Sequence, residues 1–197
     1  MKSKNSKMHH TAMAFTEQVW RQCRVTLMVC GGFARDCFFD LEAKDVDLIV
    51  CDNNDYDNSQ VEWLLSQFRK VAFEMDPDYQ WADLSDFDVG MEGGVELYED
   101  GNFAQRIAKV WHFKVRGVEI DIILNHEQLT IDDQETAVSY FDCNINQYAL
   151  DDVGVPYFFG QTSEDPAVAG LTFFNEVSDK RKAHMLDKWE QIKQVIN

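Results

Sequence analysis

Two segments of the sequence alternate acidic and aliphatic residues with the two-residue period of a β-strand: DVDLIVC at 45–51 and VEIDIIL at 118–124. Successive side chains of a strand point to opposite faces of its sheet. The aliphatic residues at even positions therefore share one face of each predicted strand, and the acids at odd positions share the other. This pattern predicts a sheet that buries one face and carries carboxylates on the other.

Four carboxylates would converge if these two strands are neighbours: Asp45, Asp47, Glu119 and Asp121. Neighbouring strands lie about 5 Å apart, so such a cluster repels itself unless cations neutralise it. Hard divalent ions, above all Mg²⁺, prefer oxygen ligands of this kind. Two ions about 4 Å apart can clamp the oxygens of a phosphoryl displacement. The alternative is an acidic sheet face open to water, and the strands alone do not separate the two.

A diglycine bend precedes the first acidic segment, in the stretch VCGGFARDC at 29–37. A strand that ends at Gly31-Gly32 and enters a helix exposes backbone N–H groups that can cradle phosphate oxygens. The patterns GxxxxGK[ST] and GxGxxG are both absent, which excludes a P-loop and a Rossmann dinucleotide site. Gly-Gly followed by Asp-x-Asp on the next strand favours a phosphate site beside a metal site.

Apolar periodicity and turn residues predict the other elements. Helices are expected at 12–23, 33–41, 58–72, 132–141 and 176–196, strands at 25–30, 44–51, 107–115 and 118–124, and a hairpin at 146–160. Asn58 or Ser59 is the expected cap of the third helix, and Arg116-Gly117 is the expected turn between the last two strands. The predicted class is therefore α+β, with a small mixed β-sheet flanked by helices.

The length of 197 residues suits one domain over 1–197, with a core at about 13–160 and a C-terminal helical segment at about 161–197. Residues 74–105 are expected to form an acidic insertion. Five cysteines without a C-x-x-C pair indicate reduced thiols. No apolar run approaches the ~20 residues that cross a bilayer, and the N-terminus lacks the apolar core of a secretory signal. We expect a cytoplasmic protein without a membrane partner.

The chain is strongly acidic, with 18 Lys and Arg against 35 Asp and Glu and a formal net charge of −17. A general nucleic-acid binder shows the reverse balance, because neutralising phosphates drives its affinity. DNA or RNA binding is therefore expected to be weak, except through a partner chain or the basic C-terminal helix. The cations of that helix, which we expect to form a solvated face, are Lys180, Arg181, Lys182, Lys188 and Lys193.

Other side chains receive structural interpretations. His9 and His10 are expected in a flexible terminus, and His112 in a strand as a satisfied sheet histidine rather than a catalytic base. The aromatic residues at helical positions are expected in the core: Trp20, Trp63, Phe68 and Trp189.

The segment Cys30–Val50 resembles the signature of the polymerase-β-type nucleotidyltransferase superfamily. Its closest resemblance is to the head domain of CCA-adding tRNA nucleotidyltransferases and bacterial poly(A) polymerases. The residues in register with that signature are Gly31, Gly32, Arg35, Asp36, Lys44, Asp45 and Asp47. A second motif of the family resembles YFDCNIN at 140–146, which retains Asp142, Ile145 and Asn146. The resemblance extends over about 25–160.

This resemblance implies a palm-like nucleotidyltransferase fold and a site for a nucleoside triphosphate (NTP) with two Mg²⁺ ions, or Mn²⁺ in their place. Asp45 and Asp47 would hold the metal, with Asp121 as the third carboxylate and Glu119 as its reserve. The residues that would contact the nucleotide are Gly31, Gly32, Arg35, Asp36, Lys44, Asp142 and Asn146.

The sequence also departs from the family. Tyr140 and Phe141 replace two arginines of the second motif, and the long helical neck, body and tail regions that select the base and grip tRNA are absent. A compact head of this kind resembles accessory nucleotidyltransferases of bacteria and their phages, whose acceptors are diverse. The expected location is the cytoplasm of a bacterium or of a phage-infected host.

The expected activity is Mg²⁺-dependent transfer of a nucleoside monophosphate from an NTP to an acceptor hydroxyl, with release of pyrophosphate. The acceptor is left open among an RNA 3′ end, a protein and a small molecule. One alternative is a catalytically silent acidic binding protein on the same scaffold, acting as a nucleic-acid mimic, inhibitor or antitoxin. Another is an RNA 3′-end extender that works with a basic partner subunit.

Overall fold

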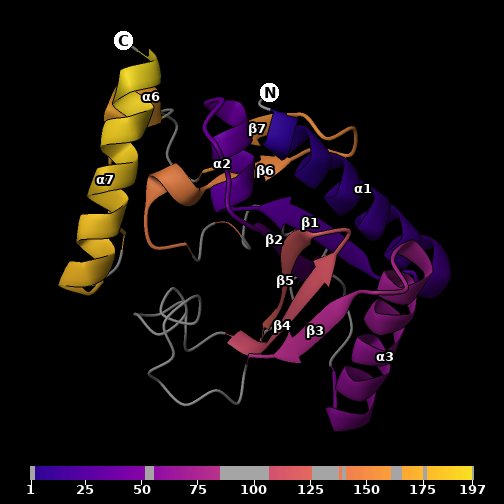
Figure 1. Ribbon diagram of the computed structural model, residues 1–197. Coiled ribbons are helices and arrows are strands. Elements are labelled where there is room, and N and C mark those ends of the chain that lie inside the picture. Colours follow the sequence, from indigo (N-terminus) through magenta and orange to yellow (C-terminus); the bar gives the residue numbers. More distant parts are fainter. Residues whose placement is uncertain are drawn as a thin grey trace.

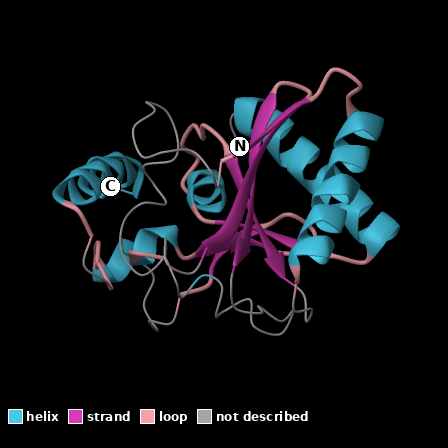
Figure 2. Ribbon diagram, turned by 90° about the horizontal axis from the view of Figure 1, so that it is seen from below, coloured by secondary structure: helices cyan, strands magenta, loops and turns pink. Residues whose placement is uncertain are grey.

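The computed structural model describes residues 3–51, 56–84, 107–125, 138, 141–160, 166–174 and 177–196. They form one seven-stranded mixed sheet with helices on both sides (Figures 1 and 2). The strands are β1 (Thr26–Cys30), β2 (Val46–Cys51), β3 (Gln80–Asp83), β4 (Ile107–Val115), β5 (Val118–Asn125), β6 (Tyr148–Leu150) and β7 (Pro156–Phe158). The helices are α1 (Ser3–Cys23), α2 (Gly32–Phe38), α3 (Asn58–Met75), α6 (Pro166–Ala169) and α7 (Asp179–Ile196), with a 3₁₀ turn η3 (Asn144–Asn146). The predicted α+β class is confirmed.

The strand order is β3-β4-β5-β2-β1-β6-β7, so the two acidic segments are neighbours. β2 and β5 run parallel, and all other paired strands run antiparallel. The register pairs Asp47 with Asp121 across β2 and β5. It also pairs Cys30, at the end of β1, with Asp47. The diglycine bend and the two acidic segments therefore meet at one place in the sheet.

The two faces of the sheet bury different sets of side chains, as the alternation predicts. The even-numbered residues of β2 and β5 pack in the main core against α1 and α3. Their contacts on α1 form a helical stripe of fully or almost fully buried residues: Met8, Ala12, Phe15 and Val19. On the opposite face, Ile49, Cys51 and Ile123 belong to a second, smaller cluster. Asp47 of β2 and Asp121 of β5 lie on this second face too, two residues before Ile49 and Ile123.

Local geometry explains how two of the elements begin and turn. Arg116 and Gly117 both have positive φ, 53° and 71°, as a two-residue hairpin turn of the right twist requires. The hairpin predicted there is confirmed. Helix α3 is capped by Asp57 and not by Asn58 or Ser59. Asp57 Oδ1 accepts a hydrogen bond from the Gln60 backbone N–H at 2.9 Å, and Gln60 Oε1 accepts one from the Asp57 N–H at 2.8 Å, a complete capping box.

Several expectations about the chain ends and surface were wrong. α1 begins at Ser3, and His9 Nε2 lies 2.7 Å from the Gly154 carbonyl oxygen, so this part of the N-terminus is a docked helix. Trp20 and Trp63 are 48% and 45% exposed; Trp20 is covered by the Arg24 guanidinium instead of the core.

Strand β3 lies within the segment expected to be an acidic insertion, whose residues 85–105 fall outside the described residues. The helix expected at 132–141 falls outside them too, except for its residues 138 and 141. Among the described residues, no helix combines the length and the apolar character needed to cross a bilayer.

We expect Phe68→Ala to lower the free energy of unfolding by about 3 kcal/mol or more, because it opens a cavity in the main core. Phe68 is fully buried on α3 and packs edge-on against Trp111 with ring centroids 5.7 Å apart. Phe73→Ala is the matched control on the same helix, since Phe73 is 56% exposed; its loss should stay within about 0.5 kcal/mol. Urea unfolding followed by circular dichroism measures both, and equal losses would contradict this packing.

Candidate active site

Three aspartates gather where β2 and β5 lie side by side. Asp47 and Asp121 are register partners, and Asp45 immediately precedes β2. Asp121 is buried, whereas Asp45 and Asp47 are half-buried. Burial and the negative charge of Asp121 raise the pKa of Asp45 above its ordinary value. The three carboxylates expected to act as a triad therefore all lie on or next to the β2–β5 pair.

The diglycine bend lies directly against this acidic group. Gly31 has φ 74° and ψ −138°, a backbone conformation that glycine alone adopts without strain. A Cβ at this position would lie 3.4 Å from Asp47 Oδ2 and 3.5 Å from the Phe141 ring. The Gly31 N–H donates to the Tyr148 carbonyl oxygen at 2.9 Å, which fixes the bend to β6. The Asp47 carboxylate and the bend therefore form one surface.

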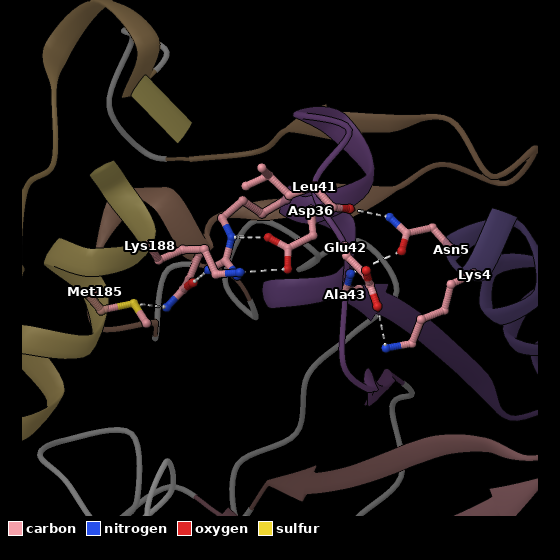
Figure 3. Close-up of polar contacts among 10 residues, drawn as sticks. Lys4, Asn5, Asp36, Leu41, Glu42, Ala43, Met185 and Lys188 are labelled. Atoms are coloured by element: carbon pink, nitrogen blue, oxygen red, sulfur yellow. Dashed lines mark hydrogen bonds and ion pairs between the residues drawn. The ribbon is translucent and has the colours of Figure 1, made fainter. Parts of the chain in front are cut away.

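Asn5 of α1 holds the loop that leads into Asp45, a contact not anticipated from the sequence. Its side chain is fully buried. It donates to the Leu41 carbonyl oxygen at 2.6 Å and accepts from the Ala43 N–H at 3.1 Å (Figure 3). One asparagine thereby satisfies two backbone groups of an irregular segment. The path of the chain just before Lys44 and Asp45 depends on this clamp.

His112 of β4 bridges the two candidates for the third carboxylate. Its Nδ1 lies 2.6 Å from Asp121 Oδ1, and its Nε2 lies 2.8 Å from Glu119 Oε2. The hydrogen bond to Asp121 is the main cause that raises the pKa of His112, and burial opposes it. Glu119 Oε1 also accepts from Lys114 Nζ at 2.6 Å. Of the two candidates, Asp121 is the one whose register partner is Asp47.

The carboxylates fit a hard divalent ion in their chemistry, because all are oxygen donors and two are register partners. Among the residues that the structure describes, no three His, Cys, Asp or Glu side chains already gather tightly enough to hold a metal ion. Their directions explain this: Asp47 Oδ2 leans toward Gly31, and Asp121 Oδ1 toward His112.

A second polar group lies behind the bend and is almost completely buried. Arg35 Nε donates to Asp36 Oδ1 at 2.8 Å, and Arg35 Nη1 donates to Asn146 Oδ1 at 2.6 Å. Asn146 Nδ2 donates in turn to Asp142 Oδ1 at 2.9 Å. These four residues are only 4–7% exposed. The motif residues expected to contact a nucleotide are therefore bound to one another.

Helix α7 closes this group with two cations. Lys188 Nζ donates to Asp36 Oδ2 at 3.1 Å (Figure 3), and Arg181 Nε donates to Asp142 Oδ2 at 2.5 Å. Met185 lies between them on the same helical stripe and accepts from Asn146 Nδ2 through its sulfur at 3.4 Å. The expectation of a wholly solvated basic face was wrong for Arg181 and Lys188, because buried carboxylates need a positive partner.

Several cations lie close together at this junction. His184 lies on the same stretch of α7, and its pKa is lowered by burial and then by Arg181, Arg35, Lys188 and Lys44. Those four cations come from α7, from α2 and from the loop before β2. Three of them are already paired with buried carboxylates, Arg35 and Lys188 with Asp36 and Arg181 with Asp142, so this group is a network of ion pairs beside the diglycine bend.

Of the two positions where the second family motif has arginines, 140 and 141, the structure describes only the second. Tyr140 lies outside the described residues. Phe141 is buried in the small cluster of the second sheet face and touches the bend at Gly31. It supplies apolar packing where the family motif supplies charge.

No protein-family model and no curated protein matches the chain. The solved structures that it matches include a CCA-adding enzyme with ATP, the Thermotoga maritima CCA-adding enzyme complexed with tRNA, and the Bacillus stearothermophilus CCA-adding enzyme with CTP. Their identities are 16%, 16% and 15%, with TM-scores of 0.46, 0.43 and 0.43. They cover 74%, 76% and 80% of this chain, which spans only 27%, 30% and 30% of theirs. All three are CCA-adding enzymes, the family that the motif at Cys30–Val50 resembles.

The Asp142–Arg181 pair should make stability depend on acid pH. Burial alone would raise the pKa of Asp142, but the hydrogen bond and charge of Arg181 outweigh it, so this pKa lies below its ordinary value. The stabilisation is complete above about pH 4, where aspartate is also ionised in the unfolded chain. It is lost as the pH falls through the lowered folded pKa.

We expect Asp142→Asn to lower the free energy of unfolding by about 3 kcal/mol at pH 7, because it breaks a mostly buried pair. The difference from the wild type should shrink steadily below about pH 4. Asp187→Asn, at an exposed position of α7, is the control and should match the wild type throughout. Urea unfolding at several pH values measures the effect; a difference that persists unchanged into strong acid would contradict it.

Proposed function

We propose that the chain is a Mg²⁺-dependent nucleotidyltransferase that moves a nucleoside monophosphate from an NTP to an acceptor hydroxyl. The observation that carries the proposal is the register of β2 and β5, which pairs Asp47 with Asp121 next to Gly31. A water-exposed acidic sheet face does not need a positive-φ glycine packed against its carboxylates. A site for a phosphate and a divalent ion needs such a glycine, because the phosphate must come close to backbone N–H groups and the ion must come close to carboxylate oxygens.

Asp45, Asp47 and Asp121 would hold the metal, with Glu119 as the reserve ligand and Mn²⁺ as an alternative ion. When bound, a divalent ion supplies charge neutralisation on the triphosphate and activation of the acceptor hydroxyl. The backbone of Gly31 and Gly32 would bind triphosphate oxygens. Positioning and electrostatic stabilisation by these groups would provide most of the rate enhancement.

In the reaction, the acceptor oxygen forms a bond to the α-phosphorus of the NTP. The bond from that phosphorus to the bridging oxygen of the β-phosphate breaks, and pyrophosphate leaves with the electron pair. The hydroxyl proton passes to a carboxylate oxygen of the acidic group. Lys44, which is exposed and directly precedes Asp45, would stabilise the negative charge of the leaving group.

The buried motif residues receive an indirect role in this proposal. Asp36, Asp142 and Asn146 hold Arg35 and α7 in place beside the bend, as their hydrogen bonds indicate. They would therefore act on the nucleotide through the cations they position. The RNA 3′ end, protein and small-molecule classes of acceptor stay open. The five free thiols support a reducing compartment such as the cytoplasm of a bacterium or of a phage-infected host.

We expect Asp47→Asn to reduce transfer by about 10³-fold or more, because it removes a charged ligand needed in the transition state. Asp121→Asn should have a similar effect, whereas Glu119→Gln should retain most of the activity. The assay incubates the protein with each α-labelled NTP, Mg²⁺ and cell extract, and asks whether RNA, protein or a small molecule carries the label. Asp187→Asn is the charge-matched control.

Transfer retained in both Asp47→Asn and Asp121→Asn would refute the catalytic assignment. A large loss for Glu119→Gln combined with retained transfer in Asp121→Asn would instead make Glu119 the third ligand. Removal of divalent ions with EDTA should abolish labelling, and added Mg²⁺ should restore it.

A second candidate function is a silent acidic binding protein on the same scaffold. The observation that favours it is that the acidic motif residues already have internal partners: His112, Arg181 and Lys188. With a net charge of −17, such a protein would bind a basic partner surface with strong salt dependence. Salt-sensitive binding to a basic protein, combined with no binding of Mg²⁺-NTP, would favour this function over catalysis.

A further inference from the structure

His112 occupies a particular place relative to the proposed metal ligands. β5 lies between β4 and β2 in the sheet, and Asp121 is the register partner of His112 on one side and of Asp47 on the other. The Asp121 carboxylate therefore has two neighbours in the same row. One of them is a nitrogen donor, and the other is a second carboxylate.

We infer that His112 is a positioning residue that fixes the orientation of the Asp121 carboxylate toward a divalent ion. His112 Nδ1 holds Oδ1 of Asp121 on the β4 side at 2.6 Å, which leaves Oδ2 as the oxygen for the β2 side, where Asp47 lies. This inference rests on the proposed function, because it assigns His112 to the same metal site. Ligands that are held by an outer hydrogen bond bind metal more tightly than ligands free to rotate.

The imidazole ring is itself held in place, which allows it to orient another group. Its Nε2 lies 2.8 Å from Glu119 Oε2, and Lys114 Nζ donates to the other oxygen of Glu119 at 2.6 Å. The chain Lys114–Glu119–His112–Asp121 therefore runs across the β4–β5 hairpin and ends at the proposed ligand. It also explains why Glu119, whose two oxygens are both engaged, is the weaker candidate for the metal.

A purely structural role would require these side chains to hold the two strands together. β4 and β5 are already paired from Lys109 to Val115 through their backbones and joined by a two-residue turn. The ring is also about one-third exposed, so its replacement leaves no cavity in the main core. We therefore expect the metal site to respond to substitution of His112 more than the fold does.

Two amide variants, His112→Asn and His112→Gln, distinguish the roles of the two ring nitrogens. An asparagine at position 112 carries its amide nitrogen close to the place of Nδ1, whereas a glutamine carries it close to the place of Nε2. His112→Phe keeps a ring of similar shape without either nitrogen. Lys109→Gln is the control on the same strand, since Lys109 Nζ lies 3.5 Å from Asp83 Oδ2 of β3 and is not part of the chain that runs from Lys114 to Asp121.

The experiment measures Mn²⁺ binding to the full chain by titration calorimetry, with unfolding midpoints recorded for each variant. We expect His112→Phe and His112→Gln to weaken Mn²⁺ binding by about 10–100-fold. His112→Asn and Lys109→Gln should bind nearly as the wild type does. If transfer is measured in parallel, the loss in His112→Phe should be recovered in part at higher Mn²⁺ concentration.

Two outcomes would overturn the inference, and they can be told apart. If the wild type binds Mn²⁺ but His112→Phe binds it equally, or if the Asn and Gln variants bind it alike, His112 does not position Asp121. If the wild type itself does not bind Mn²⁺, or if Asp47→Asn binds it equally, the proposed metal site fails and the inference falls with it. If His112→Phe loses both folding and binding, the comparison of His112→Gln with His112→Asn decides the question, because only the asparagine keeps a nitrogen near the place of Nδ1.

Discussion

The parallel pairing of β2 and β5 is the constraint on which the candidate site depends. It is the one parallel pair in the seven-stranded sheet, and its register pairs Asp47 with Asp121. A shift by one residue would turn Leu48 and Ile122 from the core to the acidic face and bury the aspartates. The apolar contacts of the even-numbered residues with α1 and α3 therefore fix the position of the acids. Core packing and site geometry are set by the same alternation.

Buried charge imposes the second constraint. Arg35 and Asp36 are each 4% exposed, and ions in such surroundings need partners with good geometry. They find them in Asn146 and Lys188, and the chain of contacts continues through Asp142 to Arg181. The C-terminal helix is thus attached through polar side chains as well as through its buried apolar residues Met185 and Ile192.

The features that could be predicted from the sequence are local. The alternation at 45–51 and 118–124, the diglycine bend and the Arg116-Gly117 turn each follow from a few adjacent residues, and each appears in the structure. The contacts that could not be predicted join distant residues: Lys188 lies 152 positions from Asp36, and Asn5 lies 38 positions from Ala43. One signal in the sequence was available for the inward face of α7, namely the helical spacing of four residues: Arg181, Met185, Lys188 and Ile192.

The distribution of the few cations follows from the acidity of the chain. With 35 acidic residues against 18 basic ones, a buried or half-buried carboxylate is stable only where a cation is drawn to it. Asp36, Asp142 and Glu119 each have a lysine or arginine partner, and Asp121 has His112. Asp45 has its negative neighbour Asp121 among the causes that raise its pKa. The unfavourable charge is therefore concentrated where β2 and β5 lie side by side, and a divalent cation would relieve it there.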